Sequence, residues 1–302
     1  MAEWRDVHLP DLHWAPRGLP GALKGLPGWI ARAASESRFA GELLDFERSA
    51  PCASYPQTPV ARQVLVIPGF GFGDAATLPM QLALSRAGFR VVRSHILANV
   101  RCSDRAVDKL AEVARDAVEQ DGHRLQVVGH SRGGMLARGL AARHPELVST
   151  AVSLGAPLND EFAFYEIPQP MVLALKVVHQ TDPELRERQC VTRNCTCPYM
   201  QATHQPFPSD VELISYYTTS DGIVDWRACV VEGAENIEVP GSHLGMGLRP
   251  DTVNLVVRRL VASAEVQRNF QLRTRDRERK LLSKIESALR RIEEGSYDYC
   301  EE

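Results

Sequence analysis

The stretch VVGHSRGG, residues 127–134, constrains the fold of this chain more than any other. An apolar, β-branched run at 125–128 predicts a buried strand, and an Ala- and Leu-rich segment at 135–143 predicts a helix. Between them lies the pattern G-x-S-x-G, whose fixed places hold Gly129, Ser131 and Gly133. A serine in so sharp a strand-to-helix turn has a strained backbone and an exposed hydroxyl, and larger flanking side chains would collide with the neighbouring elements. The pattern predicts a nucleophilic serine; the alternative is a glycine-rich turn that lets strand and helix pack closely.

Strands and helices alternate on both sides of this turn. The hydrophobic patterns predict strands at 63–67, 89–93, 150–154, 211–217 and 236–239, and helices at 78–87, 103–119 and 252–261. Alternation of this kind predicts a mostly parallel central sheet with helices on both faces.

A nucleophilic serine also needs an acid and a base, and candidates follow it in the chain order Ser, Asp, His. Asp221 comes directly after a predicted strand, at the edge where sites of parallel sheets collect, so it is preferred over Asp225 as the acid. The alternative for either aspartate is a capping or turn role. His243 also follows a strand, inside the glycine-rich loop PGSHLGMG, and is the predicted base. His130 precedes the serine and is expected to point away from its hydroxyl.

Oxyanion stabilisation requires backbone N–H donors near the serine. The residue after the nucleophile, Arg132, is one candidate, and Phe70 in the loop after the first strand is the other. The Arg132 guanidinium has two possible roles: contacting an anionic substrate group, or pairing with a nearby carboxylate. We expect three apolar side chains to line the substrate site: Phe72, Leu244 and Met171.

These stretches together resemble the α/β-hydrolase superfamily. The segments LVIPGFGFGD, GHSRGG and SLGAPL are similar to bacterial lipase- and esterase-like serine hydrolases, and TTSDGIV followed by ENIEVPGSHLG is similar to the acid and histidine region of small bacterial lipases. The resemblance covers about residues 60–160 and 210–262. It implies the α/β-hydrolase fold, with Ser131, Asp221 and His243 as the triad and Phe70 and Arg132 as oxyanion donors.

Three segments lie outside this pattern. Residues 1–58, rich in proline and glycine, are predicted to be an N-terminal arm, with an amphipathic helix at 31–46 whose apolar face holds Ala34, Phe39, Leu43 and Phe46. Residues 158–208 interrupt the catalytic domain, 59–266, and are predicted to be a lid-like insertion over the site, with a plain covering flap as the alternative.

Residues 267–302 are predicted to be a C-terminal extension with an amphipathic helix, striped by Leu281, Ile285, Leu289 and Ile292. It would dock on the body, pair with another subunit in a homo-oligomer, or touch an anionic membrane.

Composition narrows the class of protein further. The formal charge of −3 over 302 residues gives no field suited to nucleic acid. The charged N-terminus lacks an apolar signal core, so a cytoplasmic protein is expected. The seven cysteines include the cluster Cys190, Cys195 and Cys197, which free thiols, a local disulfide or zinc would each explain. No metal or cofactor is expected.

The leading hypothesis is a serine hydrolase that cleaves carboxylic esters through an acyl-enzyme on Ser131. An acyltransferase would use the same triad and pass the acyl group to an alcohol or amine. A non-catalytic binding protein on a hydrolase fold is the third possibility.

Overall fold

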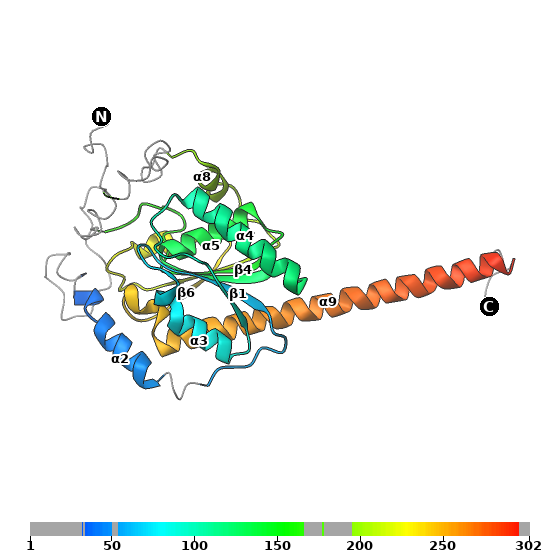
Figure 1. Ribbon diagram of the computed structural model, residues 1–302, viewed down its shortest axis with the longest axis horizontal. Helices are drawn as coiled ribbons and strands as arrows, with labels where there is room; N and C mark the ends of the chain where they lie inside the picture. Colours follow the sequence, from blue (N-terminus) through cyan, green and yellow to red (C-terminus); the bar gives the residue numbers. More distant parts are fainter. Residues whose placement is uncertain (1–31, 33, 50–53, 166–176, 178–194, 296–302) are drawn as a thin grey trace.

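A computed structural model describes residues 32, 34–49, 54–165, 177 and 195–295. Its centre is a six-stranded sheet in the order β2-β1-β3-β4-β5-β6, with every neighbouring pair parallel (Figure 1). The strands are β1 Gln63–Ile67, β2 Arg90–Arg93, β3 Leu125–His130, β4 Val148–Leu154, β5 Glu212–Tyr217 and β6 Glu235–Glu238. The predicted alternation of strands and helices, and the parallel sheet that follows from it, are confirmed.

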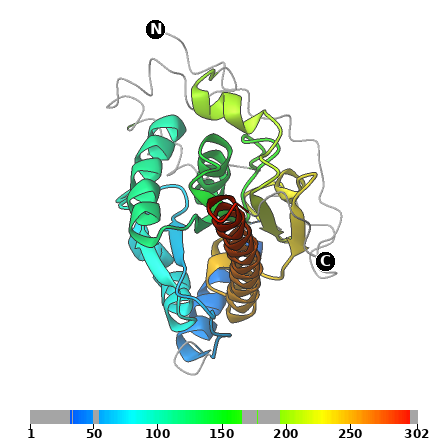
Figure 2. The same cartoon turned by 90° about the vertical axis from the view of Figure 1, so that its right-hand side faces the viewer.

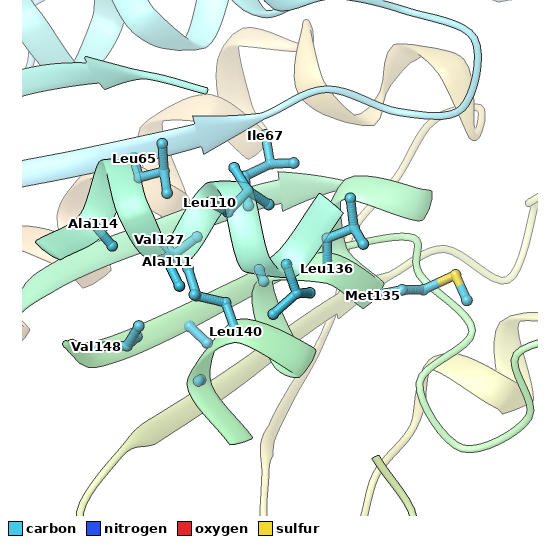
Figure 3. Close-up of a cluster of buried hydrophobic side chains, with 14 of the residues drawn as sticks. Leu65, Ile67, Leu110, Ala111, Ala114, Val127, Met135, Leu136, Leu140 and Val148 are labelled. Atoms are coloured by element: carbon cyan, nitrogen blue, oxygen red, sulfur yellow. The ribbon is translucent and has the colours of Figure 1, made fainter. Parts of the chain in front are cut away.

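Helices cover both faces of the sheet, as expected for buried parallel strands. Side chains of β1 alternate between the two cores. Leu65 and Ile67 pack with α4 (Ser103–Asp121) and α5 (Arg132–Arg143) on one face (Figure 3). Val64 and Val66 pack on the other face with α3 (Leu78–Arg86) and the first part of α9 (Pro250–Glu293). Short 3₁₀ helices follow three strands: η4 Asp74–Thr77, η5 Trp226–Cys229 and η6 Leu244–Gly247.

The C-terminal helix differs from the prediction of two separate helices. The segment predicted at 252–261 and the amphipathic segment after 267 form one helix, α9, of 44 residues. Pro250 occupies its first turn, and its interior holds neither proline nor glycine until Gly295, whose φ is +69°. No local signal therefore ends the helix where it leaves the sheet.

Only the first part of α9 packs on the body. Its buried side chains are Thr252, Val253, Val256, Val257, Leu260, Val261, Ser263 and Ala264. From Glu265 onward most side chains are exposed, and after the contacts of Gln267 and Gln271 with the body the helix projects into solvent (Figures 1 and 2). Apolar side chains lie exposed along this part: Val266, Phe270, Leu272, Leu281, Leu282, Ile285, Leu289 and Ile292. The described residues therefore leave the predicted stripe without a covering surface.

The N-terminal arm also differs from its predicted pattern. Residues 34–36 are helical, a turn follows, and α2 runs from Phe39 to Ser49. Leu43, expected on the apolar face, is 36% exposed, whereas the polar Ser35 and Glu42 are 3% and 4% exposed. The buried face of the arm is polar because its carboxylates bind backbone N–H groups of the body.

Much of the predicted insertion, including Met171 and Cys190, lies outside the described residues. Its last part forms α8 (Pro198–Thr203), which packs against α4 and α5 (Figure 2). Cys195 and Cys197 are buried there, and burial raises the pKa of Cys197 to about 12. Among the described residues, no three His, Cys, Asp or Glu side chains gather where they could hold a metal ion. None of the helices in those ranges combines the length and apolar character needed to cross a bilayer.

Candidate active site

Ser131 occupies a strained turn between β3 and α5. Its φ of +52° and ψ of −124° lie outside the ordinary regions for a non-glycine residue. Its N–H donates to the Leu154 carbonyl at 2.7 Å, and its carbonyl accepts from Gly134 N at 2.8 Å. The turn is thereby fixed to the end of β4 and to the first turn of α5.

The glycines of the turn permit close approach of backbone atoms. A Cβ on Gly129 would lie 2.1 Å from the Gly133 carbonyl oxygen, and one on Gly133 would lie 2.3 Å from the Ile67 carbonyl oxygen. A Cβ on Gly69, the residue before Phe70, would lie 3.5 Å from Ser131 Cβ. The loop after β1 therefore lies directly beside the serine.

Asp221 and His243 form a buried pair. Asp221 Oδ2 lies 2.6 Å from His243 Nδ1, and the two residues are 5% and 2% exposed. Asp221 Oδ1 accepts from Ile223 N at 2.8 Å and Val224 N at 2.7 Å, which fixes the carboxylate and leaves Oδ2 for the imidazole. Asp225 instead caps η5, accepting from Arg227 N at 3.1 Å.

The surroundings of His243 set its proton affinity. Burial alone lowers the pKa of this imidazole, but the charge and hydrogen bond of Asp221, together with the charge of Glu36, outweigh burial and raise the pKa above its usual 6.5. Its Nδ1 carries the proton shared with Asp221, so Nε2 is the basic nitrogen of the neutral ring.

His130 faces the backbone of the histidine loop. Its Nε2 lies 2.8 Å from the His243 carbonyl oxygen, and the two ring centroids are 5.1 Å apart. Burial lowers the pKa of His130 to about 4, so the ring is neutral at physiological pH. A neutral His130 donates through Nε2–H, and it ties the residue before Ser131 to the His243 loop.

Asn99 holds the loop that carries Phe70. Its Nδ2 donates to the Pro68 carbonyl at 2.7 Å, and its backbone accepts from Gly71 N at 3.1 Å and donates to the Phe72 carbonyl at 2.9 Å. Its Oδ1 accepts from Arg132 Nε at 3.1 Å. Asn99 is 2% exposed and contacts both the loop that carries Phe70 and the side chain of Arg132, the two predicted oxyanion donors.

The Arg132 side chain points toward the start of α4. Besides Asn99, the guanidinium donates to the Arg101 carbonyl at 2.5 Å and to Ser103 Oγ at 3.1 Å. These hydrogen bonds orient the side chain along the loop before α4. Of the predicted substrate-lining residues, Phe72 is 51% exposed and Leu244 begins η6 directly after His243. Met171 lies outside the described residues.

Of the predicted triad residues, Asp221 and His243 are in direct contact. His130, the residue before Ser131, contacts the backbone carbonyl of His243. Sequence reasoning missed Asn99, Glu36 and Glu42, which bind backbone groups of the site from distant segments. No sequence pattern around Asn99 predicts its role. The glycines of GSHLG indicate that another group packs closely against this loop, but they do not identify Glu42 as that group.

Comparison with known proteins finds similarity in two parts of the chain, the first of which is the sheet domain. A family model described as alpha/beta hydrolase fold matches residues 64–177. Three lipase structures align over most of their own length: a monoacylglycerol lipase from Paleococcus ferrophilus (18% identity, 70% of this chain and 98% of that chain, TM-score 0.47), a Bacillus licheniformis lipase (13%, 69% and 95%, 0.48) and a monoglyceride lipase from Saccharomyces cerevisiae (17%, 70% and 89%, 0.47).

The C-terminal helix matches a different group of proteins. A family model for the N-terminal domain of the DnaK suppressor protein DksA matches residues 258–292. The RNA polymerase-binding transcription factor DksA of Caulobacter vibrioides is 40% identical over 105 residues, which are 34% of this chain and 66% of that protein. The protein of the same name from Escherichia coli is 48% identical over 40 residues, 13% of this chain and 26% of its own length. The chain therefore spans less than two thirds of these relatives.

A parallel sheet with helices on both faces, a strained serine elbow after β3, and an Asp–His pair after β5 and β6 define one class of protein. The domain built on this sheet has the α/β-hydrolase fold, and residues 64–177 match the family model of that fold. The DksA-like stretch overlaps the last turns of α9 that pack on that domain and continues along the projecting part.

Proposed function

We propose that this protein is a serine hydrolase that cleaves carboxylic esters. The observation that carries the proposal is the buried Asp221–His243 pair, which lies beside a serine elbow whose backbone is strained. That combination supplies a nucleophile, a base and an orienting acid in one place. Because the glycine loop carrying Phe70 lies against Ser131, oxyanion donors are at hand as well.

The chemistry follows from these roles. His243 Nε2 takes the Ser131 hydroxyl proton while Oγ attacks the ester carbonyl, and the N–H groups of Phe70 and Arg132 stabilise the oxyanion. The tetrahedral intermediate collapses, the imidazolium gives its proton to the leaving alkoxide, and an acyl-serine remains. Water then attacks the acyl-serine with His243 again as base, which releases the acid and regenerates the hydroxyl. Asp221 stabilises the imidazolium in both halves.

Hydrolysis of a panel of chromogenic acyl esters, from short to long chains, tests the proposal. Ser131→Ala should lower kcat by on the order of 10⁴-fold or more. A fluorophosphonate probe should label Ser131 in the wild type and lose that labelling in His243→Gln. Wild-type activity in Ser131→Ala would end the proposal. Products formed in the presence of competing alcohols would separate hydrolysis from acyl transfer to an acceptor.

We also propose that the projecting part of α9, residues 265–293, binds RNA polymerase. The support is its likeness to a protein named for binding that enzyme, together with the exposed apolar side chains on this part of the helix. The full chain should co-sediment with purified bacterial RNA polymerase, and the double variant Leu281→Ser, Ile285→Ser should not. Leu97→Ser, at a 95% exposed leucine on the body, is the matched control.

Sedimentation of the protein alone tests the alternative, in which the exposed side of this helix binds a second copy of the chain. A concentration-dependent dimer that the double variant abolishes, with no complex formed with the polymerase, would replace this proposal with self-association through the C-terminal helix.

A further inference from the structure

The N-terminal arm inserts two carboxylates into the loops that carry the Asp–His pair. Glu36 Oε1 accepts from His243 N at 2.9 Å and from Gly222 N at 2.9 Å, and Oε2 accepts from Leu244 N at 3.2 Å. One side chain therefore bridges the residue after the acid and the backbone of the base. The same two loops are also joined by the Asp221–His243 contact and by the Thr218 hydroxyl, which donates to the Gly241 carbonyl at 3.1 Å.

Glu42, six residues further along the arm, binds Ser242, the residue before the base. Its Oε1 accepts from Ser242 N at 2.9 Å and its Oε2 accepts from the Ser242 hydroxyl. Arg249 Nη1 lies 3.7 Å from Glu42 Oε1 and balances its charge. Glu42 is 4% exposed, so its carboxylate has exchanged water for these partners.

The glycines of both loops make room for these carboxylates. A Cβ on Gly245 would lie 1.7 Å from Glu42 Oε2, one on Gly241 would lie 2.8 Å from Glu42 Oε1, and one on Gly222 would lie 2.8 Å from Glu36 Cγ. In contrast, a Cβ on Gly247 would meet nothing within 4 Å. The loops are thus shaped around the arm at the points where it enters.

From this geometry we propose that Glu36 is a positioning residue for His243, and that the arm completes the active site by fixing the base loop against the acid loop. The inference rests on the proposed ester hydrolysis. Charge adds to position, because Glu36 also favours the protonated imidazole. The other ionisable side chains in contact with His243 are Asp221 and His130, and burial lowers the pKa of His130 to about 4, so that ring is neutral near pH 7.

Two variants of Glu36 separate positioning from charge. Glu36→Ala removes the bridge, and we expect kcat to fall by about 10- to 100-fold with KM changed less than about twofold, because the base is misplaced relative to the serine. Glu36→Gln keeps a carbonyl acceptor, so kcat should recover in large part. It removes the negative charge, so the ascending limb of the pH–rate profile should move to lower pH. Glu47→Gln, an exposed glutamate of α2, is the control.

A second measurement does not depend on activity. Titration of the His243 imidazole by NMR, assigned through its loss in His243→Gln, should show a lower pKa in Glu36→Gln than in the wild type. If the esters are not cleaved but this shift is seen, the proposed function fails and the arm's role stands. Wild-type kcat in Glu36→Ala, or an unchanged His243 pKa in Glu36→Gln, would overturn the inference, and the isosteric variant gives that answer even if Glu36→Ala does not fold.

Discussion

Asn99 is the residue on which both predicted oxyanion donors converge. Every polar group of its side chain is used, with Nδ2 on the Pro68 carbonyl and Oδ1 on Arg132 Nε. Neither contact touches the reacting atoms, so Asn99 acts by holding the loop of Phe70 at a fixed distance from the elbow.

Replacing Asn99 with alanine should therefore weaken transition-state stabilisation more than substrate binding. We expect kcat to fall by roughly 10- to 100-fold with little change in KM, since oxyanion donors lose their value when displaced. Ester kinetics provide the measurement, and Asn269→Ala, at an exposed asparagine of α9, is the control. Equal kcat in the two variants would exclude a positioning role for Asn99.

The pKa directions of the two histidines predict the pH dependence of hydrolysis. The base must be neutral to act, and its pKa is raised, so kcat/KM should rise with pH with a midpoint above 6.5. His130, with a pKa of about 4, is already neutral there and should add no second ionisation between pH 5 and 8. A midpoint below 6.5, or a two-proton slope, in a kcat/KM profile would contradict this assignment.

Individual site residues could be predicted from the sequence where they lie within a recognisable motif. Ser131, Asp221 and His243 each follow a strand and carry a recognisable neighbourhood, and the preference for Asp221 over Asp225 agrees with the contact to His243. Glu36 could not be predicted, because it lies 207 positions from the N–H group that it binds. Its partners are backbone groups, which leave no complementary side chain to read.

Among the elements, the arm shows how a polar helix face can be buried. The periodic apolar residues of 31–46 favoured a helix packed through Phe39 and Leu43, yet Glu42 is the buried member. Hydrogen bonds to Ser242 offset the desolvation of this carboxylate, so hydrophobic periodicity alone did not identify the most buried side chain, although Phe39 and Phe46 are partly buried as predicted.

Gly245→Ala should loosen the arm, because the added methyl group would occupy the position of Glu42 Oε2. Hydrogen exchange of the α2 amides, residues 39–49, should become faster, whereas exchange in β3 should not change. Gly247→Ala lies in the same 3₁₀ helix with open space at its Cβ and should behave as the wild type. Identical exchange in the two variants would show that the arm does not depend on this contact.

In the whole molecule, α9 belongs to two regions at once. Its first turns close one core with Val253, Val257 and Leu260, and beyond Gln271 the helix projects away from the body (Figure 1). The sequence indicated both segments but not their continuity, since a change in composition near 267 is not a helix stop. The continuity of the helix follows from the absence of glycine and proline between Asp251 and Glu294, because these residues are the usual helix breakers.

Removal of residues 273–302 should leave the hydrolase domain intact. The last described contacts of α9 with the body are made by Gln267 and Gln271, to Thr150, Arg62 and His123. We therefore expect Tm to shift by less than about 2 °C and ester hydrolysis to be unchanged, because none of the described side chains removed, residues 273–295, is buried. Calorimetry and sedimentation would show a smaller, equally stable particle; an unfolded product would contradict the prediction.

Because one continuous helix, α9, both packs on the domain and projects from it, the number of residues between the two parts fixes the angle of the exposed stripe around the helix axis. The part beyond Ala264 reaches about 44 Å at 1.5 Å per residue. A single alanine inserted after Leu272 would rotate Leu281 and Ile285 by about 100° around the axis, while moving them only about 1.5 Å. Seven inserted residues would return the stripe to within about 20° of its starting angle. A partner bound to the far end of α9 would therefore fix the orientation of the sheet edge that carries Ser131, Asp221 and His243.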